Sequence, residues 1–312
     1  MALRLSTDRA ESLGILSGYF YTARRLNSEV GKIFSSILSL EELSNNLSIV
    51  MNSVNFLTEN ENLDHKESKT FIGGNVIFDK VTFAYPSRAQ NNVVENFSFV
   101  FEKDKKYGIA GKNGIGKSTI TKILLKLYKS FKGSVLVNQR NLSVIDTAEL
   151  HRNTCRLNNR PSFFNMSIAE NIFYPFTYDK DQDLKKLIYA AREARVFGFI
   201  KSLPAGFDTV LREGGTDLSE GQKQQLEAMR VFIRNYEVYI FDEILSNVHP
   251  STRKVILKNI FASIKNKLVI AIDHHYDIFA YMDYVYAFSS RKLTRIRYPE
   301  RLFENKLGRE NS

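Results

Sequence analysis

The sequence predicts an α/β fold whose parallel sheet carries a nucleotide site. Two apolar runs, VYIFDE at 238–243 and KLVIAIDHH at 267–275, are continuous rather than alternating, as expected of strands that are buried on both faces. A glycine-rich turn, GKNGIGKST at 111–119, stands between a β-rich run and a helical pattern. Strands that alternate with helices place functional groups at the carboxyl ends of the strands.

Four segments follow one another along the chain. Residues 1–57 contain no proline and keep a heptad seam from Leu26 to Val54, which predicts a helical extension that packs along another helix. An ordinary amphipathic helix lying on its own domain explains the seam equally well. A polar linker is expected at 58–70, the main domain at 71–300 with a more helical part at about 160–236, and a tail at 301–312.

Composition narrows the class of protein. The 312 residues are 43% hydrophobic, which is enough for a buried core, and their net charge of +10 favours an acidic partner such as nucleotide phosphates, anionic lipid or nucleic acid. Cys155 is the one cysteine, so an internal disulfide and a cysteine-rich zinc site are excluded and a reducing compartment is indicated. No run approaches the roughly 18 apolar residues of a membrane helix, and no signal peptide is expected.

The turn at 111–119 fits the phosphate-loop pattern G-x-x-x-x-G-K-[ST] in the required context, after a strand and before a helix. Its glycines let backbone amides curl around phosphate oxygens, and the following helix adds positive potential. Lys117 is expected to reach the β- and γ-phosphates, and the Ser118 hydroxyl to ligate Mg²⁺. The predicted nucleotide-binding residues of this loop are Gly111, Asn113, Gly114, Gly116, Lys117, Ser118 and Thr119.

Further motifs resemble those of ATP-binding cassette (ABC) proteins. DLSEGQKQQ at 217–225 resembles the family's signature, VYIFDE its Walker B strand, and VTFAYPS its adenine-stacking segment with Tyr85 as the aromatic residue. LPAGFDTVLREGG is similar to a run of exporter-type cassettes, and VIAIDHH to the strand before the switch histidine, here His274. The resemblance extends from about residue 74 to 298. It implies a P-loop NTPase (ABC-type ATPase) with a RecA-like core, an antiparallel β subdomain and a helical signature subdomain, preceded by the N-terminal helical extension.

The resemblance also implies roles for the site residues. Asp242 would hold Mg²⁺ through water, and Glu243 would orient or deprotonate the attacking water. Lys117 and His274 complete the implied catalytic set, with His274 at the γ-phosphate. Asn159 stands where the family has a glutamine that contacts the metal or the water. The signature residues implied to bind ATP are Ser219, Gly221 and Gln222. The cofactors are then ATP and Mg²⁺.

Two kinds of partner follow from the resemblance. A second cassette, identical or different, would bind head to tail, so that the signature of one chain faces the phosphate loop of the other. The transmembrane domain of an ABC transporter would be the other partner, because residues 1–70 look like the cytosolic continuation of a last transmembrane helix. The implied location is the cytoplasmic face of a membrane, as a peripheral subunit or a fragment of an integral transporter. No nucleic-acid partner is expected.

The sequence departs from the family at four positions. Asn159 is one methylene shorter than glutamine, Glu220 replaces a signature glycine, and Gln225 replaces a common arginine. His249 stands in place of an aspartate that couples the two sites of a dimer. We therefore keep two alternatives to an exporter ATPase: a degenerate cassette that binds ATP and regulates a competent partner, and a soluble non-transport ABC ATPase. The second is less favoured because the chain shows neither a second cassette nor a long coiled-coil insertion.

Overall fold

The computed structural model describes residues 73–85, 91–128, 130–289 and 292–296. These residues belong to one compact unit, Ser68–Ser312. The predicted helical extension at 1–57, the linker at 58–70 and the tail at 301–312 lie outside the described residues.

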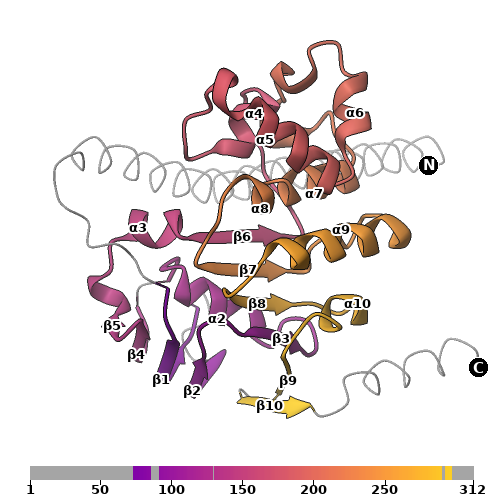
Figure 1. Cartoon of the computed structure of the whole chain (residues 1–312). Helices are drawn as coiled ribbons and strands as arrows, with labels where there is room; N and C mark the ends of the chain where they lie inside the picture. The colour runs from indigo at the N-terminus through magenta and orange to yellow at the C-terminus, as the bar shows by residue number, and fades with distance from the viewer. Residues whose placement is uncertain (1–72, 86–90, 129, 290–291, 297–312) are drawn as a thin grey trace, which may run out of the picture. The chain divides into compact units, whose positions relative to one another are not determined.

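A six-stranded sheet forms the centre of the unit (Figure 1), with the strand order β10-β9-β3-β8-β7-β6. Neighbouring strands from β9 to β6 run parallel, and β10 pairs antiparallel with β9 at the edge. The continuous burial of β7 and β8 confirms the two predicted parallel strands. The strands are β3 (Lys106–Ala110), β6 (Thr154–Asn158), β7 (Val238–Asp242), β8 (Leu268–Ile272), β9 (Tyr284–Ser289) and β10 (Lys292–Ile296).

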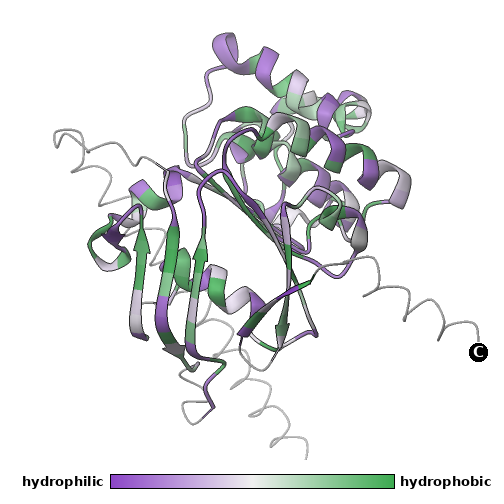
Figure 2. Ribbon diagram, turned by 60° about the horizontal axis from the view of Figure 1, so that its bottom comes forward, coloured by the Kyte–Doolittle hydropathy of each residue, from purple (hydrophilic) through white to green (hydrophobic). Residues whose placement is uncertain are grey.

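A second, antiparallel sheet has the order β2-β1-β4-β5. Hydrophilic and hydrophobic residues mix along its strands (Figure 2), because one face is buried and the other reaches solvent. This sheet matches the antiparallel subdomain that the sequence resemblance implied. Its strands are β1 (Val76–Phe83), β2 (Val94–Phe101), β4 (Lys132–Val137) and β5 (Arg140–Asn141).

Helices gather beyond β6 into a separate layer (Figure 1), which corresponds to the expected helical part at about 160–236. The helix-forming stretch at 181–203 is interrupted near Arg195, whose φ of 57° is left-handed. The layer contains α4 (Ile168–Phe173), α5 (Lys180–Glu193), α6 (Phe197–Ser202), η3 (Gly206–Asp208), η4 (Glu213–Gly215), α7 (Glu220–Ala228) and α8 (Arg230–Ile233). The remaining helices are α2 (Lys117–Leu124), η2 (Leu142–Val144), α3 (Thr147–Arg152), α9 (Pro250–Ser263) and α10 (Tyr276–Phe279).

The central sheet separates two hydrophobic cores. Alternate residues of the buried strands point to opposite faces, so Ile240 and Ile270 join the core that includes the antiparallel sheet and α2. Phe241 and Ala271 join the core under α9 and the helical layer. Because both faces are covered, the strands are held rigidly and their carboxyl ends form a fixed edge. None of the described helices is long and apolar enough to span a bilayer.

Candidate functional site

The residues predicted to contact phosphate, metal and the attacking water lie where the parallel strands of the central sheet end, because they follow neighbouring strands. In the strand order β3-β8-β7-β6, the phosphate loop follows β3 and His274 comes shortly after β8. Asp242 ends β7, and Asn159 follows β6. The carboxyl ends of adjacent parallel strands are the usual ligand-binding edge of such sheets. The topology therefore brings together four segments that are far apart in the sequence.

The phosphate loop is shaped by its backbone. Gly116 has a φ of 107°, and a Cβ there would lie 2.7 Å from Val93 Cγ1, so a side chain would strain the loop and clash. The buried Lys117 ammonium donates to the carbonyls of Gly111 at 2.7 Å and Lys112 at 2.8 Å. Burial lowers the pKa of Lys117, and the carboxylates of Glu243 and Asp242 oppose this shift. The loop thus holds the positively charged Lys117 ammonium at the start of helix α2.

Ser118 and Asp242 form a pair of oxygen ligands beside this cation. The Ser118 hydroxyl donates to Asp242 Oδ1 at 3.0 Å. Burial raises the pKa of Asp242, and the bond from Ser118 works against that rise. A hydroxyl and a carboxylate side by side are hard oxygen donors of the kind that Mg²⁺ takes when phosphates supply the remaining ligands. This pair therefore fits a Mg²⁺ ion.

Glu243 is the centre of a second cluster. Asn159 Nδ2 donates to its Oε2 at 3.0 Å, and His274 Nε2 lies 2.9 Å from its Oε1. The distance to His274 is that of an ion pair, but the angle is not that of a hydrogen bond, and Nε2 has no other partner. We interpret it as a close contact between the buried Nε2 atom and the Glu243 carboxylate. Glu243 itself has a φ of 54°, and its amide donates to Ile272 O at 2.8 Å. Two neighbouring strands thus fix its unusual backbone.

The residue expected to stack on the adenine base and the residues of the signature lie outside these two clusters. The Tyr85 hydroxyl lies 2.8 Å from Thr119 Oγ1, which ties the expected base-stacking ring to the first turn of α2. Ser219 caps α7 with Gln222 in a capping box, since each side chain bonds the other's backbone amide. Ser219 is exposed at a helix start, and no described contact joins it to the phosphate loop. Asn113 is also exposed.

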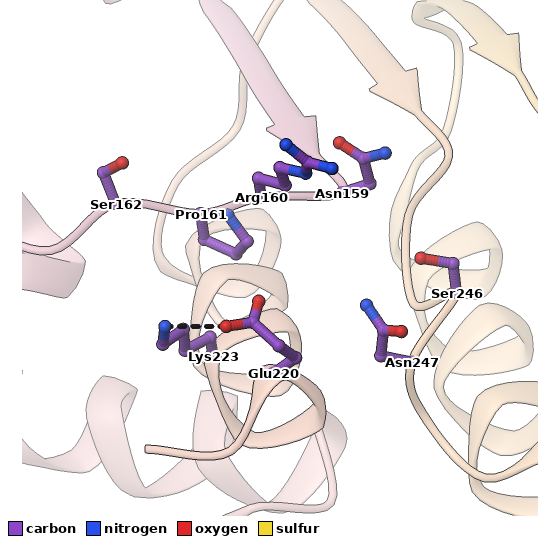
Figure 3. Close-up of a pocket in the computed structure, with 8 residues that line it drawn as sticks. All are labelled: Asn159, Arg160, Pro161, Ser162, Glu220, Lys223, Ser246 and Asn247. Carbon is purple, nitrogen blue, oxygen red and sulfur yellow. Dashed lines mark hydrogen bonds and ion pairs between the residues drawn. The ribbon is translucent and has the colours of Figure 1, made fainter. Parts of the chain in front are cut away.

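A polar cavity of about 520 Å³ opens between the segment that follows β6, the start of α7 and the turn that follows β7. Figure 3 shows Asn159 and Arg160 on one wall, Ser246 and Asn247 on another, and Glu220 with Lys223 at the start of α7. Glu220 lines the cavity and forms an ion pair with Lys223 Nζ at 2.8 Å, so its negative charge has a partner there. The cavity lining is Asn159, Arg160, Pro161, Ser162, Glu220, Lys223, Ser246 and Asn247.

Sequence reasoning missed two buried polar groups behind the site. Gln224 of α7 bonds Asn159 and the turn at 246–247. Arg253 of α9 donates to Asp273 Oδ2 at 2.9 Å, to Asp277 Oδ2 at 2.7 Å and to the Ile244 carbonyl at 2.8 Å. Asp273 in turn accepts the His274 amide at 2.6 Å. A signal was present for Arg253, because Ile256, Leu257 and Ile260 make the rest of its stripe on α9 apolar, where a polar side chain requires a buried partner. Gln224 shares its side of α7 with Glu227 and gave no such signal.

Neighbouring groups stabilise the charged form of the Asp273 carboxylate. Burial raises its pKa, but the hydrogen bond from the His275 side chain and the charge of Arg253 outweigh this effect and hold the pKa below its usual range. His275 Nδ1 lies 3.0 Å from Asp273 Oδ1, and this bond raises the pKa of His275. The segment that carries His274 therefore rests on a buried ion pair.

The remaining departures from the family pattern lie at the periphery. His249 is exposed as the N-cap residue of α9, and its Nδ1 lies 2.9 Å from Ser251 Oγ. Gln225 donates to the carbonyls of Ala194 at 3.2 Å and Arg195 at 3.0 Å, facing away from Glu243. Neither side chain contacts the clusters around Lys117 and Glu243.

Comparison with known proteins identifies the domain. The family described as "ABC transporter" matches residues 94–246, a range that runs from β2 through the phosphate loop and α7 to the turn after β7. The chain carries an ABC transporter ATP-binding domain. Its fold is that of an ABC ATPase, and it is related to exporter-type ABC transporters.

Three similar proteins illustrate the relationship of this ABC domain. A probable ABC transporter ATP-binding/permease protein of Haemophilus influenzae is 29% identical over 84% of this chain and 47% of its own length. An ATP-dependent lipid A-core flippase of Blochmanniella floridana is 32% identical over 65% of this chain and 34% of its length. The structure of a bacterial Atm1-family ABC exporter with ATP bound superposes with a TM-score of 0.67 and 26% identity, covering 76% of this chain and 41% of that one. The chain thus spans less than half of each relative.

Proposed function

We propose that the chain binds and hydrolyses Mg²⁺-ATP and thereby powers export by an ABC transporter. The observation that carries the proposal is the convergence at one sheet edge of a buried lysine, a hydroxyl–carboxylate pair and a carboxylate flanked by an amide and an imidazole. These are the groups that phosphoryl transfer requires: a cation at the phosphates, a metal site and a residue that positions water. The proposed domain is 71–300, after the proposed extension and linker.

The proposed reaction transfers the γ-phosphoryl group of ATP to water. Lys117 neutralises the phosphates, and Glu243 orients the water and accepts its proton while the water oxygen bonds to phosphorus. The bond from phosphorus to the bridging oxygen breaks, and ADP and phosphate leave. Asn159 donates to Glu243, and His274, which lies beside Glu243, would contact the γ-phosphate. Ser118 and Asp242 would hold Mg²⁺, and a bound Mg²⁺ would supply neutralisation of the charge on the leaving group.

The exposed start of α7 supports a role for a second cassette. Ser219, Gly221 and Gln222 lie at a helix N-terminus, where backbone amides favour an anion. In this proposal they contact ATP held by a partner cassette, and the shared γ-phosphate closes the dimer until hydrolysis releases it. A transmembrane domain is the proposed second partner, at the cytoplasmic face of a membrane. The solved exporter and the lipid A-core flippase are transport proteins, which is consistent with this role.

A degenerate cassette that binds ATP and regulates a competent partner is the second candidate. Two observations favour it: the shorter Asn159 already uses its amide nitrogen on Glu243, and the exposed His249 carries no carboxylate. In that case ATP would bind, and turnover by the purified chain would be absent under all conditions.

The experiment that tests the proposal measures ATP affinity by calorimetry and phosphate release for the purified full chain with Mg²⁺. Lys117→Ala should weaken ATP binding by at least about a hundredfold, since a buried cation at the phosphates is lost. Lys254→Ala, an exposed lysine of α9, is the matched control and should bind as the wild type does. Wild-type affinity in Lys117→Ala would contradict the assignment of the site.

A further inference from the structure

Gln224 lies at the junction of three segments of the site. It is 2% exposed, and both its amide nitrogen and its amide oxygen are hydrogen-bonded. Nε2 donates to Asn159 O at 2.8 Å and to Ser246 Oγ at 3.1 Å, while Oε1 accepts the Asn247 amide at 2.8 Å. A buried amide with three bonds to two separate segments fixes both, because breaking any bond leaves a buried polar group unpaired.

Glu227 extends this buried polar face by one helical turn. It lies three residues after Gln224, on the same side of α7. Its carboxylate accepts the Asn158 amide at 3.1 Å and Asn158 Nδ2 at 3.3 Å. The two side chains therefore attach consecutive residues at the end of β6 to α7.

The two anchored segments are those that surround Glu243. Asn159 donates to Glu243 Oε2, so a shift of Asn159 moves the partner of the carboxylate. The turn at 246–247 follows Glu243 and Leu245, both of which have left-handed backbones with φ of 54° and 57°. Such conformations persist only where the surroundings impose them. The helix also approaches this turn closely, since a Cβ on Gly221 would meet Asn247 O at 2.8 Å.

We propose that Gln224 is a positioning residue for hydrolysis: it holds Asn159 and the 246–247 turn so that Glu243 keeps the orientation in which it handles water. The inference rests on the proposed ATPase activity. Gln224 touches no phosphate-loop residue in any described contact, so its effect falls on the chemical step and not on nucleotide affinity.

The test compares two neighbouring glutamines of the same helix. Gln224→Met keeps the length of the side chain but loses all three bonds, and should lower kcat of the full chain about tenfold with KM for ATP within about twofold. Gln225→Met is the matched control, because Gln225 also makes two bonds from Nε2 but to the carbonyls of Ala194 and Arg195. The control should leave kcat within about twofold of the wild type.

A double-mutant cycle decides whether Gln224 acts through Asn159. If it does, Asn159→Ala combined with Gln224→Met should lose less turnover than the sum of the two single losses, since coupled residues are not additive. Additive losses would overturn the proposed route. A merely structural role would instead lower stability and affinity together, without a split between kcat and KM.

Hydrogen exchange provides a readout that does not depend on turnover. Gln224→Met should speed exchange of backbone amides in 159–162 and 246–248, whereas Gln225→Met should leave those segments unchanged. Unchanged exchange there, or an equal loss of kcat in both variants, would overturn the inference. Failure of the wild-type chain to bind ATP would contradict the proposed function, whereas binding and hydrolysis that do not respond to Gln224→Met would contradict only this inference.

Discussion

The phosphate loop and the Glu243 cluster share one edge of the sheet but are supported differently. In the loop, Gly116 and the backbone carbonyls of residues 111 and 112 shape the site, and the supporting groups are local in sequence. Around Glu243, the supporting side chains come from several elements: Asn159 donates to Glu243 Oε2, and Gln224 of α7 donates to the Asn159 carbonyl. Asp273, which accepts the His274 amide, is in turn held by Arg253 of α9. The loop therefore depends on its conformation, whereas the Glu243 cluster depends on a buried polar network.

The largest expected effect comes from removing the Arg253 guanidinium, the cation that pairs with Asp273. Arg253→Met leaves Asp273 buried without its cation, and we expect a loss of about 3–5 kcal/mol in the free energy of unfolding, measured with denaturant. Lys254→Met, on the exposed side of the same helix, should change it by less than about 0.5 kcal/mol. Adding Asp273→Asn to Arg253→Met should restore part of the loss. A loss below about 1 kcal/mol would show that the pair is not a structural support.

A pH dependence should distinguish the polar network from the loop. Burial raises the pKa of Glu227 from 4.5 to about 7, so the folded state holds this proton more tightly than the unfolded state. Stability from this group is complete below pH 4.5 and is lost as the pH rises to 7, an effect of up to about 3 kcal/mol. Glu227→Gln should flatten this part of the unfolding curve against pH. An unchanged slope would contradict a buried, proton-binding Glu227.

ATP binding by the phosphate loop should instead be sensitive to strain in the loop backbone. Gly116→Ala places a Cβ at a φ of 107° and 2.7 Å from Val93 Cγ1. We expect ATP affinity, measured by calorimetry, to fall about tenfold or more, with a stability loss of about 1–3 kcal/mol. Gly198→Ala is the matched control, because nothing lies within 4 Å of its added Cβ in helix α6. Equal ATP affinities in the two variants would mean that loop conformation does not limit binding.

The smallest expected effect concerns the turn at the start of α9. His249→Asp should raise turnover about two- to fivefold at unchanged ATP affinity if the missing carboxylate couples two sites. His249 makes no side-chain cap bond to α9, so aspartate should also add about 0.5–1 kcal/mol of stability. His249→Asn separates the two effects, because it caps the helix without charge. A turnover that rises equally in both variants would show that coupling does not require the acid.

The contrast between the phosphate loop and the Glu243 cluster explains which features the sequence could predict. The loop at 111–119 is contiguous, and the apolar residues of VYIFDE and KLVIAIDHH are continuously buried, so local patterns predicted these elements and the α/β fold. The break near Arg195 within 181–203 was not predictable, because a left-handed residue there satisfies packing and not propensity. Gln224 and Arg253 were missed because their partners are set by topology, although the position of Arg253 on an apolar stripe marked it.

The most direct measurement of the central claim is ATP turnover of the full chain against a Glu243→Gln variant, with ATP affinity measured on both. Glutamine keeps the shape and the contact with Asn159 but cannot accept the proton of water. We expect turnover to fall at least about a hundredfold while the affinity for ATP stays within about threefold. Equal turnover in the two proteins would contradict the assignment of Glu243 as the catalytic carboxylate.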